Sequence, residues 1–234
     1  MGWKYGAYEW IPLPGADGRY MQVFPMEGIS FPGWCISLII AAMNTAWESD
    51  LASCLACLRA GGVILYPTDT IWGLGCAPSS AAAVSKIYDM KGRGAEKSLI
   101  LLASSLDQVS RLVGDIPDAA RQQMKEAGDR PITIIYPRVL GAASAVAAAD
   151  GSLAIRVTVD PFCKALIDAF GHPVTSTSAN LSGQPFTGSF ADIHRSLVQS
   201  ADYVVRWRQA EEIHAAPSRI VKLLEDGNVQ EIRP

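Results

Sequence analysis

The chain has 234 residues, of which 49% are hydrophobic and 18% charged, with a formal net charge of −3. This composition is typical of a globular protein and excludes a disordered one, and the slight negative charge excludes a protein that coats nucleic acid through bulk electrostatics. Five scattered cysteines favour a reducing compartment. The longest apolar run, 34–43, is too short to span a bilayer. We therefore expect a cytoplasmic protein.

The N-terminal part differs from the rest of the chain. Residues 1–42 carry prolines and glycines at irregular spacing and show no helical or strand period. Beyond Met43, apolar residues at helical spacing lead to Gly61, which is a typical helix stop. We predict an N-terminal extension over 1–42, poorly ordered or a mis-assigned start, and a single domain over 43–234.

Cys54 and Cys57 form a C-x-x-C pair within this predicted first helix. A second cysteine pair or nearby histidines would be needed for a typical metal site, and the sequence offers neither. The pair is better interpreted as small buried hydrophobes, and we predict no metal site.

Short apolar runs alternate with helical patterns after residue 62. Strands are predicted at 62–67, 99–103, 131–137, 152–159, 173–177, 202–206, 218–224 and 229–233, and helices at 79–90, 105–112, 117–127, 160–170 and 190–197. Because the order is mixed rather than strictly alternating, we expect an α/β domain with a twisted, mixed parallel and antiparallel sheet flanked by helices.

A cluster of cations follows the predicted helix 79–90. Lys91, Arg93 and Lys97 fall within seven residues, beside Gly92 and Gly94, which allow a ligand to approach the backbone closely. Arginine suits bidentate contact with phosphate, and lysine acts as a point charge. The loop is interpreted either as an anion site or as a solvated surface.

A further arginine lies in the middle of the strand "SLAIRVTV". Strand alternation places Arg156 on one face together with Ser152, and the apolar residues on the other, namely Leu153, Ile155, Val157 and Val159. A mid-strand arginine needs an anionic neighbour, which is either a ligand or a structural salt bridge.

Two polar turns complete the candidate site. "PTDT" places Thr68, Asp69 and Thr70 after the strand 62–67, and "STSAN" places small hydroxyl and amide groups at the end of the strand 173–177. Such groups can hydrogen-bond phosphate or ribose, although turn formation alone also explains them. Without an apparent nucleophile–base pair or Walker motif, the residues predict a site that positions a phosphate-bearing ligand.

Several segments together resemble the YrdC-like family, the threonylcarbamoyl-AMP synthases, in its short form without the extra C-terminal domain. They are "GGVILYPTDTIWGLGCAP", "IYDMKGRGAEKSLILLA", "LAIRV", "VTSTSANLSGQP" and "APSRIVKLLEDGNVQEIRP". The resemblance covers about residues 50–234. It implies an enzyme, a nucleotidyltransferase, that converts L-threonine, bicarbonate and ATP into threonylcarbamoyl-adenylate and pyrophosphate. A separate complex then transfers the threonylcarbamoyl group to the tRNA adenosine next to the anticodon.

The resemblance also implies roles for individual residues. Threonine and bicarbonate are expected at Thr68, Arg156, Ser176 and Ser218; ATP is expected at Lys91, Arg93, Ser152, Ser178, Asn180 and Arg233; Lys91, Arg93, Ser178 and Asn180 are the expected catalytic residues. Mg²⁺ is expected with ATP, because charge builds up on phosphate oxygens during the reaction. Direct contact with tRNA is a further possibility, and no membrane partner is expected.

One departure from the family's pattern concerns the first turn. Its usual tyrosine after P-T-D-T is Trp72 here, which removes a hydroxyl and keeps an aromatic wall.

Two other readings remain open at this point. The same basic pocket could serve an RNA-binding or ribosome-associated module, although no aromatic-interleaved basic stripe is present. A carbamoyl-transferring module of the hydrogenase-maturation type shares the fold, but it usually sits in a longer chain with zinc-finger-like cysteines.

Overall fold

The computed structural model describes residues 9–12, 20–23, 47–92, 99–128, 130–140, 146–185, 188–211 and 217–234. The chain divides into two units, Met1–Asn44 and Thr45–Pro234. In the first unit, strands β1 (Glu9–Pro12) and β2 (Tyr20–Val23) pair antiparallel. No helix within the described residues is long and apolar enough to cross a membrane.

The second unit is an α/β domain whose first helical residues are 47–59. The elements that follow are β3 (Ile64–Tyr66), β4 (Gly73–Gly75), α2 (Ala81–Lys91), β5 (Ile100–Ala103), α3 (Leu106–Val113), α4 (Asp118–Ala127), β6 (Ile132–Tyr136), β7 (Leu153–Val157), α5 (Pro161–Phe170), β8 (Val174–Ser178), the 3₁₀ turn η2 (Phe190–Asp192), α6 (Arg195–Ser200), β9 (Tyr203–Val204), β10 (Arg219–Leu223) and β11 (Val229–Arg233).

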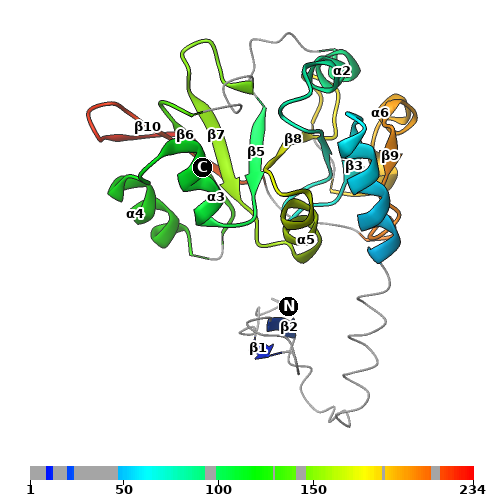
Figure 1. Cartoon of the computed structure of the whole chain (residues 1–234), viewed down its shortest axis with the longest axis horizontal. Helices are drawn as coiled ribbons and strands as arrows, with labels where there is room; N and C mark the ends of the chain where they lie inside the picture. Colours follow the sequence, from blue (N-terminus) through cyan, green and yellow to red (C-terminus); the bar gives the residue numbers. More distant parts are fainter. Residues whose placement is uncertain are drawn as a thin grey trace, which may run out of the picture. The chain divides into compact units, whose positions relative to one another are not determined.

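Within the described residues, nine strands form one sheet in the order β11-β10-β6-β7-β5-β8-β4-β3-β9 (Figure 1). Strand β5 runs parallel to β7, whereas β6 runs antiparallel to β7 and β8 antiparallel to β5. The predicted fold class, an α/β domain with a mixed sheet flanked by helices, is confirmed.

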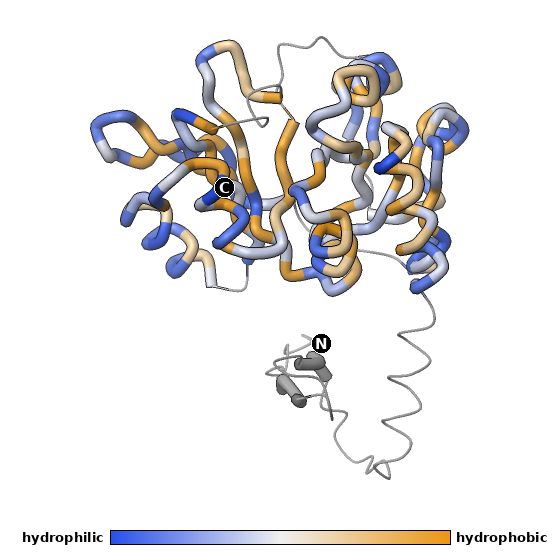
Figure 2. The backbone as a smooth tube through the Cα atoms, in the orientation of Figure 1, coloured by the Kyte–Doolittle hydropathy of each residue, from blue (hydrophilic) through white to orange (hydrophobic). Residues whose placement is uncertain are grey.

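Hydrophobic residues on the two faces of the sheet belong to different cores. Leu101 and Ala103 of β5 join a cluster with Val109 of α3 and Ala120 of α4, while Leu102 joins the cluster that contains residues of α5. This division follows from the alternation of side chains along a strand. Figure 2 shows β5 as one of the most hydrophobic segments of the domain. The sheet is therefore covered on both faces at its centre.

The structure corrects three sequence expectations. The segment 73–75 pairs as strand β4, where the sequence predicts no strand. The helix expected at 190–197 is divided into η2 and α6, because His194 acts as a new cap and its ring nitrogen accepts a hydrogen bond from the backbone amide of Ser196. Val159 lies beyond the end of β7 and is 65% exposed, so it does not share the buried face of that strand.

Cys54 is fully buried in the core, which supports the interpretation of the C-x-x-C pair as hydrophobes. Cys57 is half-buried, and its thiol contacts the carbonyl oxygen of Val63 at 3.8 Å. Burial raises the pKa of both thiols, so neither is poised as a thiolate.

Strand β4 lies so close to its neighbours that Gly75 has no room for a side chain. A Cβ there would lie 2.6 Å from the carbonyl oxygen of Thr175 and 2.7 Å from Cε1 of Tyr66. We expect Gly75→Ala to lower the free energy of unfolding by about 2–3 kcal/mol through overpacking. The melting temperature, measured by circular dichroism, should fall by about 5–10 °C.

Gly73→Ala on the same strand is the matched control. Its Cβ would meet the Ser176 hydroxyl at 3.1 Å and the carbonyl oxygen of Thr177 at 3.3 Å. We expect a smaller loss of stability there, because a side-chain hydroxyl can move aside. Equal melting temperatures for the two variants would contradict the close packing at Gly75.

Candidate active site on one face of the sheet

The turn after β3 is fixed by its own hydroxyl groups. The Thr68 hydroxyl donates to the carbonyl oxygen of Ile71 at 2.8 Å and accepts from the Thr70 amide at 3.1 Å. The two threonine hydroxyls are 3.0 Å apart, and both residues are buried. The turn therefore presents Thr68, one of the predicted substrate residues, in a single local conformation.

Arg156 connects this turn to the central sheet. Its Nη1 donates to the Thr70 hydroxyl at 3.0 Å, and its Nη2 lies 3.1 Å from Oδ1 of Asp69. Only 6% of each charged side chain is exposed. The structural salt bridge, one of the two alternatives left open by the sequence, is thus present. Nε of Arg156 has no hydrogen-bond partner among the described residues, and a buried unpaired donor calls for an explanation such as a ligand.

The K-x-R lysine and the S-x-N turn meet although they lie far apart in sequence. Helix α2 begins at the Ser80 cap and ends at Gly92, whose φ of 57° is left-handed, so Lys91 is its last residue. The Lys91 ammonium donates to the carbonyl oxygen of Ser178 and, at 2.7 Å, to that of Asn180. The Ser178 hydroxyl in turn donates to Oδ1 of Asn180. Three of the four predicted catalytic residues therefore form one cluster.

The fourth predicted catalytic residue, Arg93, lies outside the described residues, as does Lys97. The structure gives no account of either side chain.

The C-terminal strands bring a second guanidinium to the same face. Arg233 of β11 donates through Nη2 at 2.8 Å and Nε at 3.1 Å to the carbonyl oxygen of Ser218. The Ser218 hydroxyl lies 2.7 Å from that of Thr133 on β6. The pKa of Arg233 is lowered, first by burial and then by the positive charge of Arg156. The two arginines are therefore electrostatic neighbours, and an anion between them would relieve their repulsion.

Ser152, predicted to contact ATP, is engaged within the protein. Its hydroxyl donates to Oδ1 of Asp150, whose other oxygen lies 3.0 Å from the Lys222 ammonium. The pKa of Asp150 is lowered, chiefly by its two hydrogen bonds from Ser152 and then by Lys222. A ligand at Ser152 would use the oxygen's remaining lone pairs or displace Asp150.

Strand register places these groups on one face of the sheet. Ser176 is opposite Ile100, and Ile100 is opposite Ala154, two residues from Arg156. On the other side of β7, Ala154 is opposite Ile135 of β6. Thr133 lies two residues before Ile135 on the same strand and is opposite Ile220 of β10. Ile220 is in turn opposite Arg233 of β11. Since cross-strand partners point to the same face, Ser176, Arg156, Thr133 and Arg233 share it.

Sequence reasoning missed one polar member of this face. Thr133 is completely buried and bonds to Ser218, and its signal was a single hydroxyl within the apolar strand "ITIIY".

The structure also changes the interpretation of Trp72. This residue is 1% exposed and packs against Phe190 with ring centroids 4.9 Å apart. It belongs to the hydrophobic core instead of forming an aromatic wall of the site.

Comparison with known proteins gives a consistent result. Residues 56–234 match the Sua5–YciO–YrdC family, which carries the description "Telomere recombination". A curated threonylcarbamoyl-AMP synthase of Xanthomonas euvesicatoria is 39% identical over 158 residues, covering 67% of this chain and 84% of that protein. The threonylcarbamoyl-AMP synthase of Cellvibrio japonicus is 38% identical over 147 residues, covering 63% of this chain and 78% of that protein.

Solved structures support the fold. E. coli YciO superposes with a TM-score of 0.68 at 22% identity, covering 78% of this chain and 87% of YciO. P. abyssi Sua5, solved in complex with L-threonine, has a TM-score of 0.68 at 24% identity; 80% of this chain is covered, but only 54% of that longer protein. With the family match extending over most of the domain, the chain belongs to the Sua5–YciO–YrdC family.

Proposed function

We propose that this chain is an enzyme that forms threonylcarbamoyl-adenylate from L-threonine, bicarbonate and ATP and releases pyrophosphate. Relatives at 36–41% identity, 75–86% of whose length is covered, are named threonylcarbamoyl-AMP synthase. The observation that carries the proposal is that the electrostatic neighbours Arg156 of β7 and Arg233 of β11 lie on one face of the sheet, while the ammonium of Lys91 is held at the end of β8 in the same sheet. Such fixed cations are what a reaction between two anionic substrates requires.

The substrate amino acid is assigned to the face around Arg156. Thr68, Ser176 and Ser218 are small buried hydroxyl residues, and in this proposal they orient the carboxylate and hydroxyl of threonine. The threonine amine reacts with bicarbonate, losing water, to give a carbamate anion. The unpaired Nε of Arg156 supports an anion at this place.

ATP is assigned to the remaining polar groups. In this proposal Lys91, Arg93, Ser178 and Asn180 hold the phosphates, and Ser152 and Arg233 contact the rest of the nucleotide. A carbamate oxygen attacks the α-phosphorus, and the bond to the β-phosphate oxygen breaks as pyrophosphate leaves. The chain's cations stabilise the charge that develops on the phosphate oxygens, so that catalysis is achieved by positioning and electrostatics.

Mg²⁺ enters this scheme as the counter-ion of the nucleotide substrate. Among the described residues, no group of three or more His, Cys, Asp or Glu side chains is arranged to hold a metal ion. The nearby carboxylates of Asp69 and Asp150 are already paired with Arg156 and Lys222. Residues 43–234 carry the activity in this proposal, in the cytoplasm, and the adenylate passes to a separate tRNA-modifying transferase complex.

The test is pyrophosphate release by the purified full chain with MgATP. We expect release that requires both L-threonine and bicarbonate, and the product should have the mass of threonylcarbamoyl-adenylate. Omission of either substrate is the internal control. Absence of release, together with RNA binding that weakens as salt is raised, would instead favour the RNA-binding module.

A further inference from the structure

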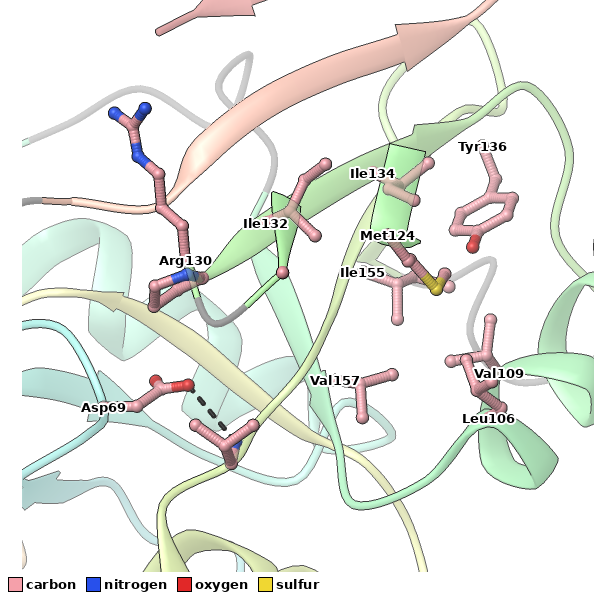
Figure 3. Close-up of a pocket in the computed structure, with 13 residues that line it drawn as sticks. Asp69, Leu106, Val109, Met124, Arg130, Ile132, Ile134, Tyr136, Ile155 and Val157 are labelled. Carbon is pink, nitrogen blue, oxygen red and sulfur yellow. Dashed lines mark hydrogen bonds between the residues drawn. The ribbon is translucent and has the colours of Figure 1, made fainter. Parts of the chain in front are cut away.

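A hollow lies on the face of strands β6 and β7 opposite to the candidate active site. It has a volume of about 240 Å³ and is drawn in Figure 3. Its apolar lining comes from β6, β7, α3 and α4, and the lining side chains are Ile132, Ile134, Ile155, Val157, Leu106, Val109 and Met124. Ile155 points into it while its neighbour Arg156 points to the other face, so the hollow and the candidate active site lie on opposite faces of the sheet, and Asp69 borders both.

The mouth and the inner end of the hollow differ in character. At the mouth are Val159, which is 65% exposed, and Asp69, whose Oδ2 accepts a hydrogen bond from the Val159 amide at 3.3 Å (Figure 3). At the other end is Tyr136, whose hydroxyl points toward the apolar lining residues (Figure 3). The hollow thus runs from the surface to a phenol group.

Tyr136 is the observation that points to a ligand. The residue is 2% exposed, and its hydroxyl has no hydrogen-bond partner among the described residues. A buried hydroxyl without a partner is unfavourable, and such groups in native proteins call for an explanation. Burial raises the pKa of this phenol to about 12, so it is a neutral donor. A ligand oxygen would satisfy it.

The lining sets the size and charge of the occupant. An apolar cavity of about 150 Å³ is known to stay dry and to accept benzene, so the larger volume suits a substituted ring or a branched aliphatic chain. A charged ligand would find no free counter-ion in the lining, since Asp69 is paired with Arg156 and the guanidinium of Arg130 points away (Figure 3). The occupant must therefore be neutral.

We propose that this hollow is a binding site for a small neutral apolar molecule that carries one hydrogen-bond-accepting oxygen, which takes the proton donated by Tyr136. The molecule enters beside Val159 and packs between the sheet and helices α3 and α4. At the mouth it contacts Asp69, the same carboxylate that holds Arg156.

Three probes of similar size test the proposal. Acetophenone has an aromatic ring and a carbonyl acceptor, ethylbenzene lacks the acceptor, and benzoate carries a charge. Each is titrated into the full chain with ¹³C-labelled methionine and isoleucine methyl groups. We expect acetophenone to bind with a Kd of about 1 mM and to shift the methyl signals of Met124, Ile132, Ile134 and Ile155. Met90, which packs against the other core, is the control reporter and should not shift.

The other probes and one variant test the chemistry. Benzoate should bind at least about tenfold more weakly than acetophenone because its charge is unpaired in the hollow. Tyr136→Phe removes only the hydroxyl, and it should weaken acetophenone about fivefold while leaving ethylbenzene unchanged. Equal affinities of wild type and Tyr136→Phe for acetophenone would overturn the role of the hydroxyl.

Filling the hollow tests its location. Val109→Phe adds a ring within the lining and should abolish the Met124 shift, with folding confirmed by circular dichroism and by unchanged pyrophosphate release. If that variant does not fold, Leu106→Trp is used, since Leu106 is 39% exposed and tolerates a larger side chain near the surface. Undiminished binding in a folded filling variant, or no shift of lining methyls in the wild type up to the solubility limit of acetophenone, would overturn the proposal.

Discussion

Lys91→Ala is expected to lower threonine- and bicarbonate-dependent pyrophosphate release by about 100- to 1,000-fold, the range found when one fixed charge-stabilising donor is removed from an active site. The Lys91 side chain is almost fully buried, and its ammonium joins the end of α2 to the turn formed by Ser178 and Asn180. The substitution therefore removes a positive charge and also releases the turn whose hydroxyl and amide are assigned to the phosphates.

Stability must be measured beside activity in this experiment. Two backbone carbonyl oxygens lose a charged donor, which we expect to lower the free energy of unfolding by about 1–3 kcal/mol. Assays are therefore run well below the melting temperature of the variant. A rate loss of the expected size in a protein that is folded under assay conditions then reports on the site, its charge and its turn together, and not on unfolding of the domain.

Lys86→Ala is the matched control on the same helix. Its ammonium pairs with Asp202 at 2.6 Å, but the two side chains are 38% and 43% exposed, so the pair contributes little. We expect turnover within about twofold of the wild type, since surface pairs are worth less than about 1 kcal/mol. Wild-type turnover in Lys91→Ala would contradict the assignment of the phosphate site.

The surroundings of Lys91 show which features of the site could be predicted from the sequence and which could not. The helix before it could be predicted, because the Ser80 cap, the apolar period and the Gly92 stop are local signals. Lys91 contacts Ser178, which lies 87 residues further along the chain. This contact depends on the position of β8 in the sheet, for which the sequence carries no local signal. The residues alone predicted one site of cations and hydroxyls for a phosphate-bearing ligand, but not which cation contacts which hydroxyl turn.

At strand β4 and at Val159, the local sequence pattern predicted a different structure from the one observed. Two glycines in the three residues of β4 give it little intrinsic strand preference, and it pairs because β3 and β8 supply partners on both sides. Val159 continued an alternating pattern, but Asp160 caps α5 by accepting a hydrogen bond from the Cys163 amide at 2.9 Å and so directs the chain away from the sheet. Tertiary pairing and capping overrode the local pattern in both places.

The alternation around Arg156 was predicted correctly, yet the sequence left two partners open for its charge. The structure supplies Asp69, and the proposed function adds the substrate anion. These two roles can be separated by a double-mutant cycle, because a structural partner affects stability whereas a substrate contact affects turnover.

Arg156→Met and Asp69→Asn are each expected to destabilise the domain, by about 3 kcal/mol for the arginine and somewhat less for the aspartate, because each leaves a buried group uncompensated. The double variant removes both members of the pair. We therefore expect it to recover most of the lost stability, as measured by the midpoint of urea unfolding. If the double variant does not recover stability, the 3.1 Å contact between Arg156 and Asp69 is not an energetically coupled pair.

Turnover should behave differently from stability. We expect Arg156→Met to lower kcat/KM for threonine by about 100-fold, as the loss of a charged contact to a substrate anion does, and Asp69→Asn to lower it by about tenfold through misplacement of the guanidinium. The double variant, although restored in stability, should stay at the level of Arg156→Met. If turnover recovers together with stability in the double variant, Arg156 contributes only to the stability of the fold. A guanidinium that binds the carboxylate or carbamate of the substrate is absent from the double variant, so restored stability alone cannot restore turnover.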